Sequence, residues 1–298
     1  MRAVDLFCGC GGLSLGFQEA GFEVVLGVDS WGPAMRVYQA NFAHPGKALD
    51  LSQVDQAITA VGAYRPDIVI GGPPCQDFSS AGKRDENNGR GDLTICFAQI
   101  VAGVGPAWFL MENVPRIRGS EKLAEAKRIL HGAGYESVEI VLDASLCGVP
   151  QQRKRFFLIG HRGRLDASLL RMLEEGLAPK PMTMSDYFGD SLGIAYYYRH
   201  PRSYARRGIF SMEEPSPTIR GVNRPIPGGY QLHHNDPVTT LAGVRPLTTK
   251  ERSLVQTFPE RFKFEGTRTV LEQVIGNAVP VKLASYVARV LLAYMARE

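Results

Sequence analysis

The sequence predicts an α/β fold: a doubly wound, mostly parallel sheet with a smaller, irregular second domain. Two features of the chain support this prediction. Short apolar segments alternate with segments of helical periodicity over residues 1–160, which is the pattern of strand–helix–strand units in a parallel sheet. After residue 185 the pattern changes, because residues 189–245 are rich in Gly, Pro, Tyr and Arg and show little helical periodicity.

Each expected strand is a short apolar run that ends at glycine, proline or a polar residue. The strands are expected at Ala3–Phe7, Glu23–Val28, Asp67–Ile70, Ala107–Met111, Val138–Leu142 and Arg155–Ile159. Helices are expected where apolar residues recur at helical spacing and suitable residues cap the ends. They are Leu13–Ala20, Pro33–Asn41, Ser120–His131, Thr248–Thr257 and Val281–Arg297.

Length and composition are those of an ordinary globular chain. Its 298 residues suffice for one large domain or two unequal ones. Hydrophobic residues make up 44% and charged residues 21%, so a large core can form without a metal or a disulfide framework. The formal net charge of +4 is compatible with a nucleic-acid partner but decides nothing alone.

The five cysteines form no CxxC pair and are odd in number, which predicts reduced thiols, a cytoplasmic protein and no metal site. The first residues lack the apolar run and cleavage site of a signal peptide. No segment offers about 18 consecutive apolar residues, so we expect no membrane span.

A glycine-rich turn, DLFCGCGG at 5–12, joins the first expected strand to the first helix. Glycines in such a turn let the backbone approach a ligand closely and direct amide groups toward it. Asp29 ends the next strand, where an acidic residue commonly binds ribose hydroxyls. These features predict a nucleotide-type cofactor, but they do not distinguish a nicotinamide dinucleotide from S-adenosylmethionine.

Cys75 follows Gly-Gly-Pro-Pro directly after the strand that ends at Ile70. Ligands of open parallel sheets bind beyond the carboxyl ends of the strands, and two prolines stiffen the loop that carries this thiol. A lone cysteine is usually a small buried hydrophobic residue. This setting instead favours a nucleophile.

The irregular region from Gly189 to Arg245 contains seven arginines, four acidic residues and no lysine. Arginines interleaved with aromatic residues suit contacts to phosphates and base edges. A solvated, loop-rich insertion would have the same composition, and these residues alone do not separate the two readings.

Five motifs stand in order along the chain: DLFCGCGG at 5–12, DIVIGGPPCQDFS at 67–79, ENV at 112–114, QQRKR at 151–155 and GNAVP at 276–280. The set resembles the motifs of the DNA (cytosine-5)-methyltransferase family in its compact bacterial or phage form. The resemblance implies a sheet of the S-adenosylmethionine-dependent methyltransferase type. It also implies methyl transfer to carbon 5 of cytosine in double-stranded DNA, with base flipping and a covalent Cys75 adduct.

The chemistry explains why these residue types are needed. Carbon 5 of cytosine is a poor nucleophile until the Cys75 thiolate adds at carbon 6. Glu112 matches the residue that donates to ring nitrogen 3, so we expect burial to raise its pKa. Arg155 and Arg153 match the residues that bond the base carbonyl oxygen and stabilise developing charge.

The resemblance also assigns binding residues. For S-adenosylmethionine they are Phe7, Gly9, Gly11, Gly12, Asp29, Asp50, Pro74, Leu93 and Asn277. For DNA they are Ser79, Lys83, Arg90, Thr218 and Arg220. The family often has a bulky residue directly after the ribose-binding acid, whereas this chain has Ser30 there and Trp31 one position later.

The resemblance divides the chain into two domains. Residues 1–188 with 268–298 would form the catalytic and cofactor-binding domain, and residues 189–267 the target-recognition domain. A polar loop over 79–92 would close over the flipped base. The expected partner is double-stranded DNA, with a cognate restriction endonuclease as a candidate, and a monomer is expected.

Three alternatives stay open at this stage. A transfer-RNA methyltransferase of the same family would carry a Cys-Phe-Thr element in the recognition region, but Cys147 is the last cysteine. A nicotinamide-dependent oxidoreductase would leave the Pro-Pro-Cys, ENV and QxRxR motifs unexplained. A non-catalytic DNA-binding module would not need Cys75, Glu112 and both arginines together.

Overall fold

The computed structural model describes residues 1–74, 93–203 and 205–297, and contacts within the chain divide it into two compact units. The first unit comprises Met1–Leu142, Lys154–Gly176 and Ala284–Glu298. The second comprises Asp143–Arg153 and Leu177–Leu283. Residues 143–153, 177–188 and 268–283 therefore pack with the second unit, although the sequence analysis placed them in the catalytic domain.

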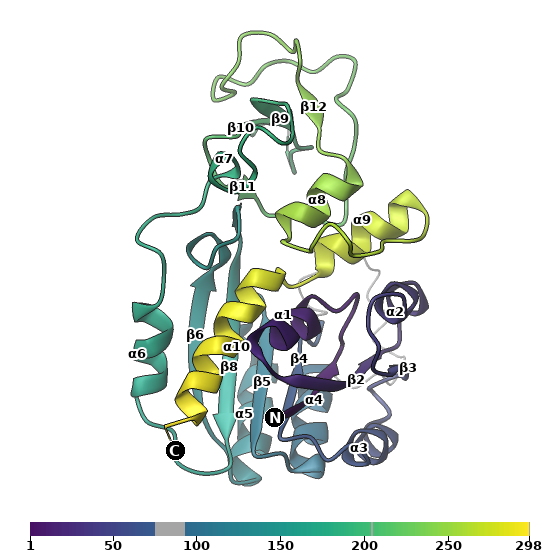
Figure 1. The fold of residues 1–298 in the computed structure, drawn as a ribbon, viewed down its shortest axis with the longest axis vertical. Helices are drawn as coiled ribbons and strands as arrows, with labels where there is room; N and C mark the ends of the chain where they lie inside the picture. The colour runs from purple at the N-terminus through teal and green to yellow at the C-terminus, as the bar shows by residue number, and fades with distance from the viewer. Residues whose placement is uncertain (75–92, 204, 298) are drawn as a thin grey trace. The chain divides into compact units, whose positions relative to one another are not determined.

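The first unit is built on a seven-stranded sheet in the order β3-β2-β1-β4-β5-β8-β6 (Figure 1). The strands are β1 (Arg2–Leu6), β2 (Glu23–Asp29), β3 (Gly46–Ala48), β4 (Ile68–Gly71), β5 (Trp108–Asn113), β6 (Glu136–Asp143) and β8 (Lys154–His161). The pairs β1–β2, β2–β3, β1–β4 and β4–β5 are parallel, and β5–β8 is antiparallel. The predicted doubly wound, mostly parallel sheet is confirmed.

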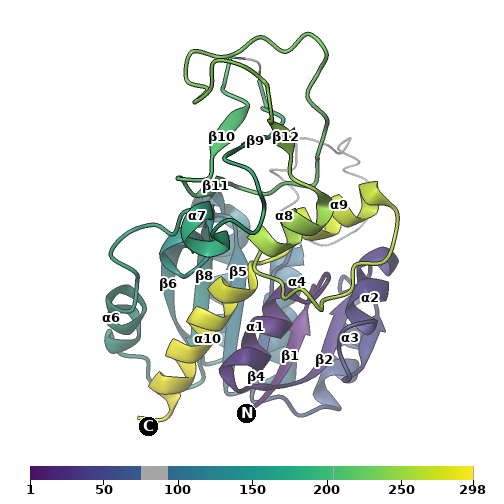
Figure 2. The ribbon, with the colours of Figure 1, turned by 45° about the horizontal axis from the view of Figure 1, so that its top comes forward.

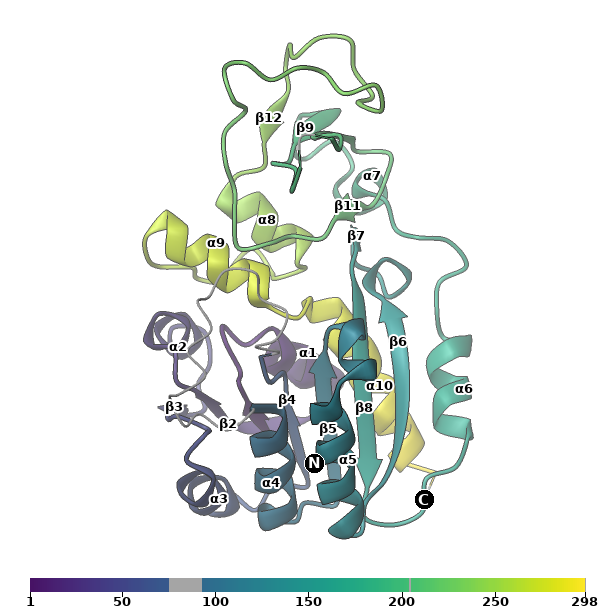
Figure 3. The ribbon, with the colours of Figure 1, turned by 180° about the vertical axis from the view of Figure 1, so that it is seen from behind.

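Helices cover both faces of this sheet. In Figures 1 and 3, α1 (Gly12–Ala20) and α10 (Val281–Met295) lie on one face, and α3 (Val54–Gly62), α4 (Leu93–Val104) and α5 (Glu121–Gly132) lie on the other. The remaining helices of this unit are α2 (Gly32–Gln39), the 3-10 helix η2 (Pro115–Gly119) and α6 (Ser168–Glu175).

Burial on both faces explains the apolar character of the central strands. All residues of β4 and β5 are buried, as are four of the five residues of β1. Their side chains pack against α3, α4 and α5 in one core cluster that includes Val69, Phe97 and Phe109. Because each such side chain stabilises the fold by about 1.5–3 kcal/mol when buried, this core fixes the strand ends that carry the site.

Irregular chain dominates the second unit, as predicted (Figure 2). Its short strands form a three-stranded sheet, β10-β9-β12, and a two-stranded sheet, β11-β7. They are β7 (Gln151–Gln152), β9 (Tyr196–Tyr198), β10 (Ile209–Ser211), β11 (Ser216–Pro217) and β12 (Arg245–Pro246). Its helices are the 3-10 helix η3 (Ala144–Leu146), α7 (Met184–Phe188), α8 (Thr249–Val255) and α9 (Arg268–Asn277).

Asp236 organises the irregular loop that precedes β12. Its carboxylate accepts hydrogen bonds from the amides of Gly208, Ile209 and His233 and from the Tyr230 hydroxyl, at 2.7–3.1 Å. Burial opposes ionisation of this carboxyl, but these hydrogen bonds outweigh it and lower the pKa of Asp236. One side chain thus replaces the regular hydrogen bonding that the loop lacks.

One apolar stretch, Arg268–Met295, is long and apolar enough to pass for a membrane span by length and composition. It comprises α9 and α10, and 61% of its most apolar window is buried inside the protein. Such burial is typical of a core helix in a globular protein, so the stretch is weak support for a span.

Candidate active site

The glycine-rich loop after β1 has the strained backbone expected where a chain wraps closely around a ligand. Phe7, Gly9 and Gly11 all have positive φ, at 57°, 54° and 92°. A Cβ atom on Gly11 would lie 2.3 Å from the Phe42 ring, so only glycine fits there. The loop is tied to β2 because the Cys8 amide donates to the Val28 carbonyl at 3.1 Å.

Asp29 closes this loop from the neighbouring strand end. Its carboxylate accepts hydrogen bonds from the Gly9 amide at 2.9 Å and from the Trp31 amide at 2.7 Å. Burial raises the pKa of Asp29, and the amide hydrogen bonds oppose that shift. The carboxylate is thus held in one orientation at the rim of the loop, as ribose binding requires.

A buried polar chain behind the loop was not predicted from the sequence. The Ser14 hydroxyl donates to Asp5 Oδ2 at 2.6 Å and lies 2.9 Å from the Tyr38 hydroxyl, which lies 2.6 Å from His44 Nε2. Asp5 is fully buried, and that burial raises its pKa to about 7. The contacts join residues up to 24 positions apart, so no local pattern could have revealed them.

The ends of β1, β4 and β5 lie side by side. The Gly72 amide donates to the Leu6 carbonyl at 3.3 Å, which brings the chain after β4 next to the glycine-rich loop. Asn113, the last residue of β5, donates from Nδ2 to the Pro73 carbonyl at 2.9 Å. A Cβ on Gly72 would lie 3.1 Å from Glu112 Oε2, so the segment that leads to Cys75 passes directly beside this carboxylate.

Glu112 and Arg155 form a largely buried ion pair across the antiparallel strands β5 and β8. Arg155 Nε lies 2.8 Å from Glu112 Oε1, and the two side chains are 13% and 10% exposed. Burial lowers the pKa of Arg155, while the adjacent Glu112 opposes that shift. The Arg155 guanidinium is thus a direct charge partner of the Glu112 carboxylate in the protein without DNA.

Arg153 has a different environment, although it lies only two residues from Arg155. It is 2% exposed, and its guanidinium donates to the carbonyls of Ile219 at 2.9 Å, Gly276 at 3.1 Å and Ala278 at 3.1 Å. Three contacts to main-chain carbonyls indicate a positioning residue within the second unit.

Neighbouring glutamines reinforce these ties. Gln151 accepts from the Ile219 amide through Oε1 at 2.8 Å and donates from Nε2 to Gln256 Oε1 at 2.8 Å. Gln256 in turn donates to the carbonyls of Ile275 and Ala278. The QxRxR and GNAVP motifs are therefore joined through residues 216–219, which explains why residues 143–153 and 268–283 pack with this unit.

The other predicted residues are placed as follows. Pro74 and Asp50 are exposed, and Leu93 begins α4. Thr218 donates from its hydroxyl to the Gln152 carbonyl at 2.9 Å. Asn277 is exposed at the end of α9 and belongs to the second unit. Cys75, Ser79, Lys83 and Arg90 lie outside the described residues, and among the described residues no cluster of His, Cys, Asp and Glu could hold a metal ion.

A mostly parallel sheet with a glycine-rich loop after β1, an acid at the end of β2 and a Glu–Arg pair beside Gly72 and Pro73 defines a methyltransferase of the nucleotide-cofactor type. Residues 1–293 match the family described as C-5 cytosine-specific DNA methylase. The chain belongs to this family, whose members depend on S-adenosylmethionine.

Bacterial relatives support this assignment over nearly the whole chain. The chain is 57% identical over 295 residues to the type II methyltransferase M.HgiDI of Herpetosiphon aurantiacus, covering 99% of this chain and 95% of that protein. It is 54% identical over 293 residues to the type II methyltransferase M.HindV of Haemophilus influenzae, covering 98% and 96%.

Solved structures confirm the fold. A putative DNA modification methyltransferase of an Escherichia coli prophage aligns with a TM-score of 0.73 at 22% identity, covering 99% of both chains. The Dnmt2 methyltransferase of Schizosaccharomyces pombe aligns with a TM-score of 0.73 at 17% identity, also covering 99% of both chains.

These comparisons confirm the predicted activity. The protein is a DNA (cytosine-5)-methyltransferase, which transfers a methyl group to carbon 5 of cytosine in DNA. The alternatives of a nicotinamide-dependent oxidoreductase and of a non-catalytic DNA-binding module are therefore wrong.

Proposed function

We propose that Cys75, Glu112 and Arg155 methylate a cytosine flipped out of double-stranded DNA, through a covalent bond between the Cys75 sulfur and carbon 6 of the base. The observation that carries this proposal is the buried Glu112–Arg155 pair beside Gly72 and Pro73, directly before the Pro74-Cys75 step. Two complementary groups are thus fixed next to the nucleophile's strand end before any base arrives.

The first unit offers a cradle that fits S-adenosylmethionine. The Asp29 carboxylate would bind the ribose hydroxyls, and the glycine-rich loop at Gly9, Gly11 and Gly12 would wrap the methionine part. Trp31, whose amide is fixed by Asp29, would take the place of the adenine-stacking residue that Ser30 cannot provide. When bound, S-adenosylmethionine supplies an electrophilic methyl group on a sulfonium.

The protein's residues would then act in sequence on the base. The Cys75 thiolate adds to carbon 6, and negative charge moves toward nitrogen 3 and the carbonyl oxygen. Arg155 holds that oxygen, and the protonated form of Glu112 donates to nitrogen 3. Once carbon 5 has gained the methyl group, solvent water accepts the proton that carbon 5 loses, the thiolate leaves and the ring is restored.

A substitution series tests the nucleophile. Cys75→Ala should abolish methyl transfer to DNA and leave S-adenosylmethionine binding intact, because the thiol takes no part in the cofactor cradle. Cys147→Ala is the matched control, since burial raises the pKa of Cys147 to about 12 and leaves it an inert thiol. Normal turnover by Cys75→Ala would refute the proposed mechanism.

Duplex DNA containing 5-fluorocytosine tests the covalent step itself. The fluorine cannot be eliminated, so the wild-type protein should form a stable adduct that survives denaturing electrophoresis. Cys75→Ala should form none. Failure of the wild-type protein to be trapped at a site that it methylates would exclude the adduct.

We also propose that the protein acts as a monomer in the cytoplasm and as the modification partner of a restriction endonuclease. The modification role is supported by the relatives named type II methyltransferases. Bisulfite sequencing of DNA from cells that express the chain would give the methylated site. That DNA should then resist a restriction endonuclease that cuts the same site, whereas DNA from cells expressing Cys75→Ala should be cut.

A further inference from the structure

A cluster of arginines without carboxylate partners lies in the second unit, on either side of β11. Its members are Arg199, Arg202, Arg220 and Arg224, with His200 beside them. In the described part of the chain none of these four arginines forms an ion pair, whereas Arg207 and Arg245 of the same unit pair with Glu214 and Glu251. The cluster therefore carries uncompensated positive charge.

The charges in this cluster are close enough to disturb one another. Burial lowers the pKa of Arg199 to about 10, and the charge of Arg220 adds to that shift. Burial also lowers the pKa of Arg220 and of His200, again with neighbouring arginines adding to the effect. Repulsion between these positive charges destabilises the protein without DNA, and a bound anion would relieve that repulsion.

Arg220 and Arg199 are held by single hydrogen bonds that leave other donors available. Arg199 donates from Nη2 to the Thr218 carbonyl at 2.9 Å, and Arg220 donates from Nη2 to the His200 carbonyl. Arg220 Nε is buried and has no hydrogen-bond partner among the described residues. Nη1 and the second hydrogen of Nη2 form no hydrogen bond among the described residues, so Arg220 keeps several donors for an anionic oxygen.

A small cavity lies at this point, lined by Arg199, His200, Arg220 and Asn223 among others. Its volume of about 20 Å³ holds one water and is far too small for a nucleobase. An anionic oxygen at its mouth could meet two guanidinium groups at once, which is the usual way arginines bind phosphate.

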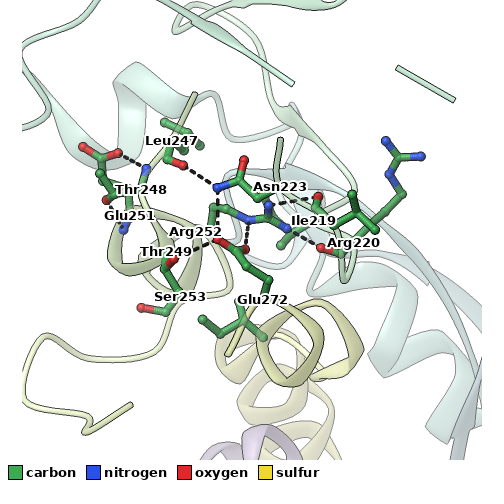
Figure 4. A network of polar contacts seen from close by, with 12 residues as sticks. Ile219, Arg220, Asn223, Leu247, Thr248, Thr249, Glu251, Arg252, Ser253 and Glu272 are labelled. Carbon is green, nitrogen blue, oxygen red and sulfur yellow. Dashed lines mark hydrogen bonds and ion pairs between the residues drawn. The ribbon is translucent and has the colours of Figure 1, made fainter. Parts of the chain in front are cut away.

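A buried network fixes the backbone that carries Arg220 (Figure 4). Arg252 pairs with Glu272, with Nε 2.9 Å from Oε2, and the two side chains are 6% and 3% exposed. The terminal nitrogens of Arg252 donate to the carbonyls of Arg220 and Val222. In Figure 4 the side chain of Arg220 points away from this network.

Glu272 also links this network to the residues that follow Arg220 and to the start of α8. Glu272 Oε1 accepts from Asn223 Nδ2 at 3.0 Å and from the Thr249 hydroxyl at 2.8 Å. Helix α9 also approaches the segment closely, because a Cβ on Gly276 would lie 2.3 Å from the Arg220 carbonyl carbon. The Arg220 backbone is therefore fixed before DNA binds, which lowers the entropy cost of using its side chain.

We propose that Arg220 and Arg199 form a binding site for one backbone phosphate of the DNA substrate, and that the Arg252–Glu272 pair acts as its positioning device. This inference rests on the proposed function, because it takes the second unit to bind DNA. It assigns Arg220 to sequence-independent anchoring of the duplex, whereas base reading belongs to other residues of the unit.

Fluorescence anisotropy with two duplexes tests the site. One duplex carries the methylated site found by bisulfite sequencing, and the other has the same composition in shuffled order; each is titrated at several salt concentrations. Arg220→Gln and Arg199→Gln should weaken binding to both duplexes by a similar factor, on the order of 5–30-fold at low salt. The slope of log K against log salt should become shallower by about one for each arginine.

The matched control is Arg261→Gln, an exposed arginine of the same unit outside the cluster, which should leave affinity and slope within about twofold of wild type. Glu272→Gln tests the positioning device: its loss of affinity should not add to that of Arg220→Gln in the double variant. Circular dichroism and S-adenosylmethionine binding must match wild type for each variant compared. If Glu272→Gln does not fold, Thr249→Val removes one hydrogen bond of the same network and takes its place.

The outcomes separate the possibilities. A loss confined to the duplex with the methylated site, with the salt slope unchanged, would overturn the proposal in favour of base reading. If Arg220→Gln and Arg199→Gln bound DNA with the affinity and salt slope of the Arg261→Gln control, the phosphate site would be excluded. A shallower slope for the arginine variants, together with normal methyl transfer by Cys75→Ala, would support the phosphate site while refuting the proposed function.

Discussion

Arg153 offers a direct test of whether a motif residue contacts the base or holds the protein together. Arg153→Lys keeps the charge but replaces a planar fork with one ammonium. A lysine can reach one or two of the three carbonyls that Arg153 bonds. At least one buried carbonyl would lose its partner.

The magnitude follows from the lost hydrogen bonds. Each bond from a charged group contributes about 1.5–3 kcal/mol, and a buried carbonyl left unsatisfied adds to the cost. Losing one or two of the three should destabilise the fold by about 2–4 kcal/mol, which lowers Tm by roughly 3–6 °C for a protein of this size. Thermal unfolding followed by circular dichroism measures the shift.

Steady-state kinetics complete the test. Because Arg153 ties residues 219 and 276–278 together, Arg153→Lys should raise KM for DNA more than it lowers kcat. Arg155→Lys is the comparison: it should lower kcat more strongly and Tm less, because a lysine can still pair with Glu112. An Arg153→Lys protein with the wild-type Tm and a kcat about 100-fold lower would show that Arg153 acts on the base, contrary to this reasoning.

Three further substitutions test the first unit. Gly11→Ala should weaken S-adenosylmethionine binding at least tenfold in calorimetry, because the new Cβ would clash with the Phe42 ring and alanine is strained at a φ of 92°. Unchanged affinity would contradict the proposed cradle. Glu112→Gln should lower kcat by about 10²-fold or more while cofactor affinity stays constant, and full activity would exclude proton sharing at nitrogen 3. Asp5 binds its proton more tightly when folded, with a pKa of about 7 against 3.8 for an ordinary aspartate, so the folded state gains stability at low pH that is lost as pH rises from about 4 to 7. Asp5→Asn should therefore flatten the pH dependence of urea unfolding by up to about 4 kcal/mol over that range, and an unchanged profile would contradict the buried carboxyl.

The strands of the sheet could be predicted from the sequence wherever burial requires a run of apolar residues. Six of its seven strands were expected within a few residues of their observed bounds, most clearly the buried parallel strands β1, β2, β4 and β5, which read as continuous apolar runs. The seventh, β3, has three residues, two of them exposed, so it carries no such run. Helix α4 was missed because it is apolar on most sides and lacks an amphipathic stripe.

The different surroundings of Arg153 and Arg155 have a similar local cause. The resemblance assigned both to the base carbonyl oxygen, and residues two apart would face the same way along a continuous strand. The chain instead ends β7 at Gln152 and begins β8 at Lys154, and the break falls at Arg153. Its side chain then enters the second unit, while Arg155 pairs with Glu112 in the first.

The break at Arg153 suggests that some motifs of the chain face the ligands while others hold the backbone in position. In the first unit the DLFCGCGG and ENV motifs present side chains and amides at neighbouring strand ends, where a ligand can reach them. In the second unit the polar groups of the motifs are hydrogen-bonded within the protein. Arg153 donates to the GNAVP carbonyls, and Gln151 accepts from the Ile219 amide. The position thus fixed is the backbone immediately before Arg220. A motif match therefore identified the enzyme correctly but could not tell residues that touch the substrate from residues that hold the substrate-binding segment in place.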